Sequence, residues 1–286
     1  MVMTRAKAYA LTAVSAVLYV LLFWAFTDGL FSLKGDVLFS QKGSDGITVI
    51  SEGTIWTYVL LAIIIITGIY QAQKLPPEGV ELRSRVDEQT PGQTHDPTWW
   101  RLLLGNVYLS VFWMPLRFFV GREWLAAGEH KIRDSKWMDG GTALVSGNPE
   151  APGFWERIVS PDAAPNPTYA WFSDFIQWMI DRGWENWFAK LIAMGEFLVG
   201  VGLVVGALVG IAAFFGSFMN FNFLLAGTAS SNPVLFGLSV FLILAWKVAG
   251  YWGLDRYLLP ALGTPWQPGK LVRRGAEPQA TPSPAD

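Results

Sequence analysis

The chain contains no cysteine and has only two histidines, His95 and His130, among its 286 residues. The absence of cysteine excludes disulfides, thiolate zinc sites, cysteine-ligated iron–sulfur clusters and any chemistry that uses a protein thiol. Two histidines are too few for a haem held between membrane histidines or for a multi-histidine metal site. We therefore expect no metal, haem or iron–sulfur cluster, and any redox centre must come from a substrate or a partner.

Charge is also scarce. Only 15% of the residues are charged, and 21 Lys and Arg nearly balance 23 Asp and Glu, so no basic field is available to bind nucleic acid. Hydrophobic residues make up 52% of the chain, and there are 15 Trp and 19 Phe. This composition is typical of an integral membrane protein rather than of two soluble domains. The bilayer is the first partner that the sequence predicts.

Long apolar runs predict six transmembrane helices in an all-α fold, because a span needs about 20 apolar residues. A cleaved signal peptide is the alternative for the first run, but that run is longer than usual and has aromatic residues where a cleavage site needs small ones. The six predicted spans lie at about residues 9–26, 55–72, 99–127, 187–207, 209–227 and 233–253.

Polar segments divide the chain into three parts. Residues 1–98 hold two spans and a charged, Pro-rich linker, and residues 99–262 form a four-helix membrane domain with a long extracytoplasmic loop at about 131–186. An amphipathic helix is expected near the end of this loop, lying on the membrane surface. Residues 263–286 are predicted to be a disordered tail. Lys and Arg are slightly more frequent on the side of the termini, which predicts that both termini are cytoplasmic.

Charged side chains within the predicted spans are the first candidate site residues. Each costs about 3 kcal/mol or more at the centre of a span unless it faces a cavity or a partner. A network of these residues could bind a quinone carbonyl, a small anion or a proton, whereas a structural ion pair and a lysine that extends to the interface are the alternatives. The candidates are Arg117, Glu196 and Lys247, with Asn220 and Asn222 as added hydrogen-bonding groups.

A second candidate site follows the third predicted span. Four cations, which suit a small oxyanion or a lipid phosphate, lie close together in the sequence. Simple anchoring at the membrane interface explains the same charges. The four residues are Arg122, Lys131, Arg133 and Lys136.

Five short stretches, in order, resemble the DoxX family. They are Trp124-x-x-x-Gly128-x-x-Lys131, Lys136-Trp-Met-Asp-Gly-Gly-Thr-Ala-Leu144, Gly195-Glu-x-Leu-Val-Gly-x-Gly-Leu203, Asn220-Phe-Asn-Phe-Leu-Leu-Ala-Gly227 with Ser231-Asn-Pro233, and Ala249-Gly-Tyr-Trp-Gly-Leu-Asp-Arg256. The resemblance covers about residues 99–262 and implies a four-helix membrane bundle in a prokaryotic plasma membrane.

Some DoxX relatives are named as the membrane subunit of thiosulfate:quinone oxidoreductase, so the resemblance implies a thiosulfate-oxidising system with quinone as electron acceptor. The four cations would then hold the anion, and the buried charges would line the quinone end. Two other functions stay open. One is a non-catalytic accessory or assembly subunit of a respiratory or photosynthetic membrane complex, and the other is an anion transporter, for which the sequence shows neither a polar path nor a repeat.

Overall fold

The computed structural model describes residues 1–28, 41–42, 48–49, 52–82, 94, 96–138, 154–159 and 169–263. The predicted tail after residue 263, most of the charged linker, His95 and much of the predicted extracytoplasmic loop lie outside this description. The described chain is mostly helical, and its strands form only two short antiparallel pairs.

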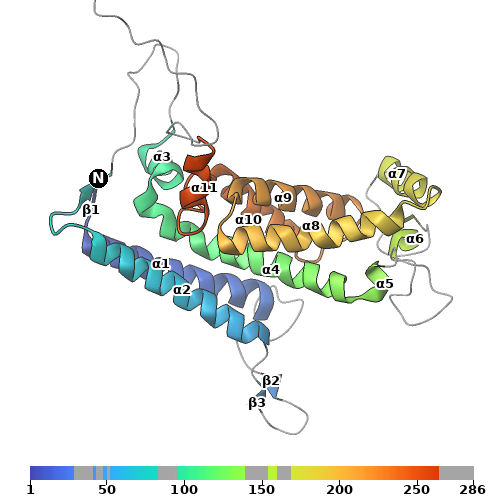
Figure 1. The fold of residues 1–286 in the computed structure, drawn as a ribbon, viewed down its shortest axis with the longest axis horizontal. Coiled ribbons are helices and arrows are strands. Elements are labelled where there is room, and N and C mark those ends of the chain that lie inside the picture. The colour runs from blue at the N-terminus through green and yellow to red at the C-terminus, as the bar shows by residue number, and fades with distance from the viewer. Residues whose placement is uncertain are drawn as a thin grey trace, which may run out of the picture.

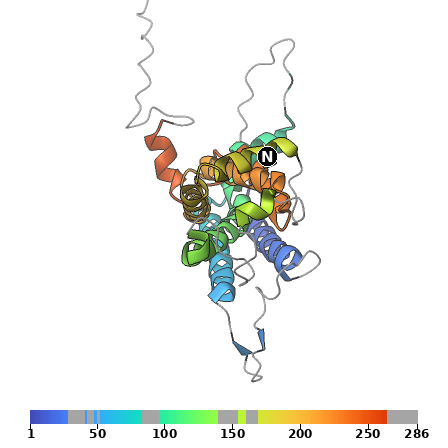
Figure 2. The ribbon, with the colours of Figure 1, turned by 90° about the vertical axis from the view of Figure 1, so that its right-hand side faces the viewer.

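Helices α1 (Arg5–Phe23) and α2 (Glu52–Lys74) form an antiparallel hairpin. The π-helical turn Trp24–Asp28 follows α1, and the strands β2 (Gln41–Lys42) and β3 (Thr48–Val49) pair between the two helices. Strand β1 (Val2–Met3) pairs with β4 (Val80–Glu81), so the start of the chain is tied to the segment that follows α2. The hairpin lies on one side of the remaining helices (Figures 1 and 2).

The helices of the second part pack side by side (Figure 1). The turn at residues 206–208 lies at one end, and the turn at residues 226–231 lies at the other end, near three small helices. The elements in chain order are α3 (Thr98–Gly105), a 3₁₀ segment (Val107–Trp113), α4 (Met114–Arg133), α5 (Ser135–Met138), α6 (Phe154–Val159), α7 (Ala170–Ile180), α8 (Glu185–Val205), α9 (Val209–Leu225), α10 (Asn232–Leu244) and α11 (Asp255–Ala261).

Three described helices are long and apolar enough to cross a membrane, namely Arg5–Phe26, Ile55–Lys74 and Glu185–Val205. A fourth crossing arises if Thr98–Gly105 and Val107–Arg133 count as one span, although the chain bends by 81° between them. Helices α9 and α10 have 17 and 13 residues, so at 1.5 Å per residue α10 is only about 20 Å long. The structure therefore supports three to four spans by length, compared with the six predicted.

One hydrophobic core joins the hairpin to the bundle. Tyr19 and Phe23 of α1 pack with Phe119 of α4, and the rings of Phe23 and Phe119 meet edge to face at 5.0 Å. A smaller core lies where α6 and α7 cover the end of α9 at Leu225. Apolar burial in these two cores therefore holds both the N-terminal hairpin and the small terminal helices against the bundle.

Helices α4 and α8 approach closely through glycines. A Cβ atom added to Gly128 would lie 2.5 Å from the Phe197 backbone nitrogen, and one added to Gly200 would lie 2.5 Å from the Leu125 backbone nitrogen. Small residues allow helix backbones to pack at short distance in this way. This contact brings the polar end of α4 against the middle of α8.

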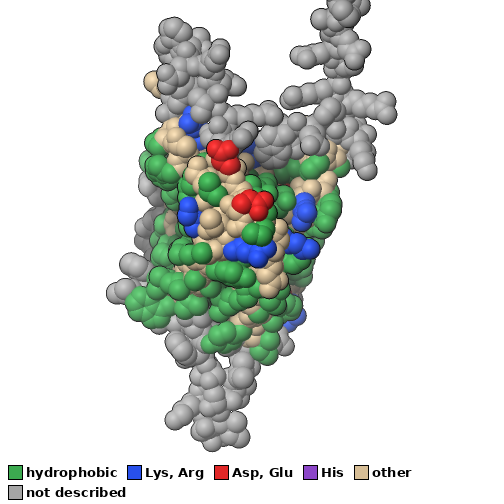
Figure 3. Space-filling view, turned by 90° about the vertical axis from the view of Figure 1, so that its left-hand side faces the viewer, with side chains coloured by type: hydrophobic (Ala, Val, Ile, Leu, Met, Phe, Trp, Pro, Cys, Tyr) green, Lys and Arg blue, Asp and Glu red, His purple; other side chains and the backbone are tan. Residues whose placement is uncertain are grey.

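The end of the molecule that carries the N-terminus, α3 and α11 bears both acidic and basic side chains (Figure 3). Hydrophobic side chains border this polar region in the same view. Such an arrangement is compatible with a chain whose apolar helices contact lipid and whose ends contact water.

Candidate functional site

The structure brings one residue from each predicted group together. Lys131, near the end of α4, places its Nζ 2.8 Å from Oε1 and 2.7 Å from Oε2 of Glu196, in the middle of α8. The side chain of Glu196 is 1% exposed and that of Lys131 is 21% exposed. The carboxylate is thus enclosed by protein, while the ammonium retains a path to water.

Aromatic rings surround the Lys131 ammonium. Its Nζ lies 5.2 Å from the ring centre of Trp137 on α5 and 5.7 Å from that of Phe223 on α9. The faces of aromatic rings attract a cation at such distances. Trp137 is itself fixed by a 2.9 Å hydrogen bond from its Nε1 to the Ala189 carbonyl oxygen. Four elements therefore position this one charged group.

A cavity of about 310 Å³ lies beside the ion pair, and we call it the Lys131–Glu196 cavity. Its walls come from α4, α5, α8, α9, the turn after α9 and the start of α10. They combine aromatic rings, hydroxyls, one amide, two carboxylates and one ammonium. The lining residues are Glu123, Trp124, Ala126, Ala127, His130, Lys131, Trp137, Glu196, Phe223, Thr228, Ser230, Ser231, Asn232 and Leu235.

Two buried polar atoms of the cavity walls have no hydrogen-bond partner among the described residues. They are Nε1 of Trp124 and Oγ1 of Thr228. A buried polar group without a partner costs about 1–3 kcal/mol, so such groups are used where a ligand or water satisfies them. The cavity therefore offers hydrogen-bonding capacity that the protein itself leaves unused.

Asn220 and Asn222 behave differently although they lie close together on α9. Asn220 is fully buried, and neither polar atom of its side chain has a partner within the described ranges. Asn222 is directed along its own helix and donates from Nδ2 to the Phe218 carbonyl oxygen at 2.8 Å. Neither residue is part of the cavity lining, and Asn220 is the one with buried polar atoms that lack a partner among the described residues.

Arg117 lies in a separate place, 14 residues before Lys131 on α4, or about 21 Å along the helix axis. Its Nη1 donates to the Ala249 carbonyl oxygen at 3.1 Å and its Nη2 to the Trp252 carbonyl oxygen at 3.0 Å. The guanidinium packs against Gly206, which ends α8 in the left-handed conformation at φ 70°. Arg117 thus joins α4 to the turns that follow α10.

Asp255 completes this second cluster, and the sequence analysis does not identify it. Its Oδ1 accepts a hydrogen bond from the Leu208 backbone N–H at 2.5 Å and its Oδ2 accepts one from Val209 at 3.0 Å, so it caps the start of α9 from the start of α11. Burial raises the pKa of this carboxyl, while the two backbone N–H groups and Arg117 act in the opposite direction. Asp255 follows the last apolar run and lies within the stretch 249–256 that carries the family resemblance, so this stretch is the signal that marks it in the sequence.

Lys247 belongs to neither cluster. It is exposed, and its Nζ lies 5.9 Å from the ring centre of Trp246. Helix α10 ends at Leu244, so Lys247 lies beyond its last turn rather than within a continuous helix to residue 253. Arg117, Glu196 and Lys247 therefore do not converge on a shared pocket.

Two of the other predicted cations, Arg122 and Arg133, have acidic neighbours. Nη1 of Arg122 lies 2.8 Å from Oε1 of Glu123, and Nη2 of Arg133 lies 2.6 Å from Oε1 of Glu129. Lys136 lies in α5, and its side chain falls outside the described part of the chain. Of the three predicted anion-binding residues whose side chains the structure describes, only Lys131 lines the Lys131–Glu196 cavity.

Comparisons with protein-family models, curated proteins and solved structures return no match for this chain.

Proposed function

We propose that the chain is a multi-pass membrane protein that binds a quinone head group in the Lys131–Glu196 cavity, as the membrane subunit of a thiosulfate-oxidising, quinone-reducing system. The observation that carries this proposal is an ammonium and a buried carboxylate that meet inside an aromatic cavity. A cavity of about 310 Å³ is within the range of small-molecule sites.

The lining chemistry favours a neutral ring with polar edges. Trp124, Trp137 and Phe223 supply flat apolar walls, and the Lys131 ammonium can donate a hydrogen bond to a quinone carbonyl. Two carboxylates and one ammonium line the cavity, so the walls repel a dianion such as thiosulfate more than they repel a neutral quinone.

Proton supply is the second requirement of quinone chemistry. Reduction of a quinone to the quinol takes up two electrons and two protons. Glu123, His130 and Glu196 all line the cavity, and carboxyl and imidazole groups are the usual proton donors in proteins. The cavity therefore holds side chains that can accept and pass on protons on the same walls as the carbonyl donor.

Thiosulfate oxidation is assigned to a partner subunit. Joining two thiosulfates into tetrathionate releases two electrons, which matches the two that one quinone accepts. Arg122 and Arg133 do not line the Lys131–Glu196 cavity, so they do not offset the repulsion of a dianion by its two carboxylates. Since the chain has no cysteine, its partner or the substrate itself must deliver the electrons.

The resemblance to the DoxX family supports the same proposal. Four of its five stretches contribute residues to one cavity, namely Trp124, Lys131, Trp137, Glu196, Phe223, Ser231 and Asn232. We place the chain in a prokaryotic plasma membrane with six spans and both termini in the cytoplasm. β1 and α11 lie at the same end of the molecule, which is consistent with an even number of crossings (Figure 1).

Binding of a short-tailed quinone to the purified chain in lipid nanodiscs tests the proposal. We expect K131M and E196Q each to weaken binding about tenfold, which corresponds to about 1.4 kcal/mol. The matched control is K247M, which removes an exposed lysine and should bind like the wild type. Absence of quinone binding, or equal binding by K131M, would overturn the quinone site.

Thiosulfate-dependent quinone reduction is measured separately, in membranes that contain the chain together with its neighbouring subunits. Loss of this activity in E196Q, with normal activity in K247M, supports the enzymatic role. Quinone binding without any thiosulfate-dependent reduction would overturn the thiosulfate assignment. Fixed-stoichiometry co-purification with a larger complex and full activity in E196Q would instead support an accessory subunit.

A further inference from the structure

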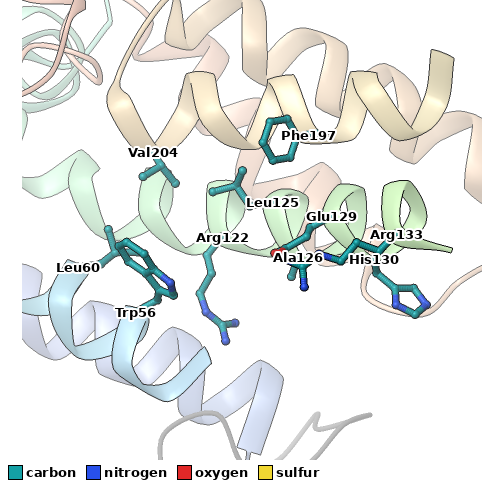
Figure 4. A pocket seen from close by; sticks show the side chains of 10 residues that line it. All are labelled: Trp56, Leu60, Arg122, Leu125, Ala126, Glu129, His130, Arg133, Phe197 and Val204. Atoms are coloured by element: carbon teal, nitrogen blue, oxygen red, sulfur yellow. The ribbon is translucent and has the colours of Figure 1, made fainter. Parts of the chain in front are cut away.

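A second and larger cavity of about 720 Å³ lies between the hairpin and the bundle, and we call it the α2–α4 groove. Figure 4 shows its side chains, which come from α2, α4 and α8. The lining residues are Trp56, Leu60, Arg122, Leu125, Ala126, Glu129, His130, Arg133, Phe197 and Val204.

The groove lies beside the half of α2 that is remote from its hydrogen bonds to the bundle. Near the end of α2, Gln71 donates from Nε2 to the Tyr108 carbonyl oxygen at 2.7 Å and accepts a hydrogen bond from Trp252 Nε1 at 3.0 Å. In Figure 1 the hairpin slants away from α4 beyond this attachment. Trp56 and Leu60, from the opposite half of α2, therefore form one wall of an open space.

The groove is amphipathic along its length. Leu60, Leu125, Phe197 and Val204 provide apolar surface toward α2 and α8. The charged groups and the imidazole all come from α4, at positions 122, 129, 130 and 133. Residues three, four, seven or eleven apart lie near one another on a helix, so these four positions share one side of α4. An apolar floor with a polar edge on a single helix matches the shape of a lipid.

The polar edge carries more positive than negative charge. Two guanidinium groups, Arg122 and Arg133, line the groove with one carboxylate, Glu129. Arg133 pairs with Glu129, and Arg122 pairs with Glu123. Each of these ion pairs involves one nitrogen of the arginine, whereas a guanidinium has five N–H donors. Further N–H groups can therefore bind an anion. Arg133 is the more exposed of the two arginines, with 76% of its side chain accessible to solvent.

We infer that the α2–α4 groove binds an anionic phospholipid, with its phosphate at His130 and Arg133 and an acyl chain along Leu125, Phe197 and Val204. Arg122, deeper on α4, donates to the ester oxygens. Arginine suits phosphate recognition because its planar fork can donate two parallel hydrogen bonds. Free phosphate would leave the apolar floor unused, and a lipid without net charge would leave the second arginine of this edge with no counterpart to its excess positive charge.

Quantitative lipid analysis and thermal unfolding of the purified full-length chain test this inference. Nanodiscs of phosphatidylglycerol are compared with nanodiscs of phosphatidylcholine, and the lipid retained after detergent extraction is counted by native mass spectrometry. We expect phosphatidylglycerol to be retained preferentially, and R122Q/R133Q to retain at least fivefold less of it. The control, R256Q, removes an exposed arginine of α11 and should retain as much as the wild type.

The single variant R133Q keeps the test valid if the double variant does not fold, because Arg133 is largely exposed and its loss leaves the core intact. Equal retention of the two lipids, or unchanged retention in R133Q and R122Q/R133Q, would overturn the inference. Stabilisation by inorganic phosphate in detergent, without any lipid dependence, would assign the arginines to a free anion and also overturn it. Quinone binding measured in parallel with R133Q should be unchanged, which separates this groove from the proposed quinone cavity.

Discussion

Lys131 and Glu196 are 65 residues apart in the sequence, and their charged groups meet at 2.7 Å with the carboxylate almost fully buried. The two partners differ in access to water, since the Lys131 side chain is 21% exposed. This difference predicts that the two single substitutions have unequal effects on stability.

K131M should destabilise the protein more than E196Q. Without Lys131, the buried Glu196 carboxylate has lost its charge partner, and breaking a buried pair in this way costs about 3–5 kcal/mol. In E196Q, the Lys131 ammonium loses its charge partner but can still reach water. We therefore expect E196Q to lower the free energy of unfolding by about 1–2 kcal/mol. Thermal unfolding in detergent measures the stability of both single variants. The double variant K131M/E196Q should be more stable than K131M, because it has no buried charge without a partner. Equal losses in the two single variants would contradict the asymmetry.

Arg117 should be essential for folding and dispensable for quinone binding. R117M leaves the carbonyl oxygens of Ala249 and Trp252 without their donor and removes the cation near Asp255. We expect R117M to lower the free energy of unfolding by about 3 kcal/mol or more. R117K should lose less, because lysine keeps the charge but cannot form both hydrogen bonds of the guanidinium. Chemical and thermal unfolding give the values. A stable R117M that no longer binds quinone would instead place Arg117 in the binding site.

Gly128 should not tolerate alanine. The added Cβ would lie 2.5 Å from the Phe197 backbone nitrogen, so α4 and α8 would have to separate. Overpacking of this kind costs about 1–3 kcal/mol, which exceeds the gain of up to about 1 kcal/mol from alanine in a helix. The control is Gly237 in α10, where an added Cβ meets no atom within 4 Å, so G237A should keep or raise the melting temperature. A destabilised G237A would show that glycine is required there for another reason.

Gln71 should control how firmly the hairpin is held. Q71L removes both the hydrogen bond to the Tyr108 carbonyl oxygen and the acceptor of Trp252 Nε1, so two polar groups lose their partner at a cost of about 1–3 kcal/mol each. Hydrogen exchange of the α2 amides should become faster while that of α8 stays unchanged. Q177L, at an exposed position of α7, is the matched control. Unchanged exchange in α2 would show that apolar packing alone holds the hairpin.

The long apolar helices can be predicted well from the sequence. The predicted runs at 9–26, 55–72 and 187–207 overlap α1, α2 and α8, because each run is long enough to specify a helix by apolar content alone. The third predicted span is less regular. Asn106 ends α3 in an extended conformation and its side chain accepts from the Tyr108 N–H, so the chain bends where hydropathy shows a continuous run.

The site is harder to predict because its contacts join distant segments. Charge within an apolar run selects Glu196 and Arg117, and both are indeed buried. Hydropathy cannot show that Lys131 is the partner of Glu196, since that depends on the close approach of α4 and α8 at Gly128 and Gly200. Lys247 meets the same sequence criterion as Glu196, but α10 ends before it and leaves it exposed.

Ala126 and His130 line both the Lys131–Glu196 cavity and the α2–α4 groove. One turn of α4 is therefore a partition between two binding spaces. If a lipid in the groove shifts this turn, the affinity for quinone changes, and quinone must then change the affinity for lipid by the same factor. Quinone affinity measured in phosphatidylglycerol and in phosphatidylcholine would thus report on communication across a single helical turn, and the composition of the surrounding bilayer would become an effector of the protein.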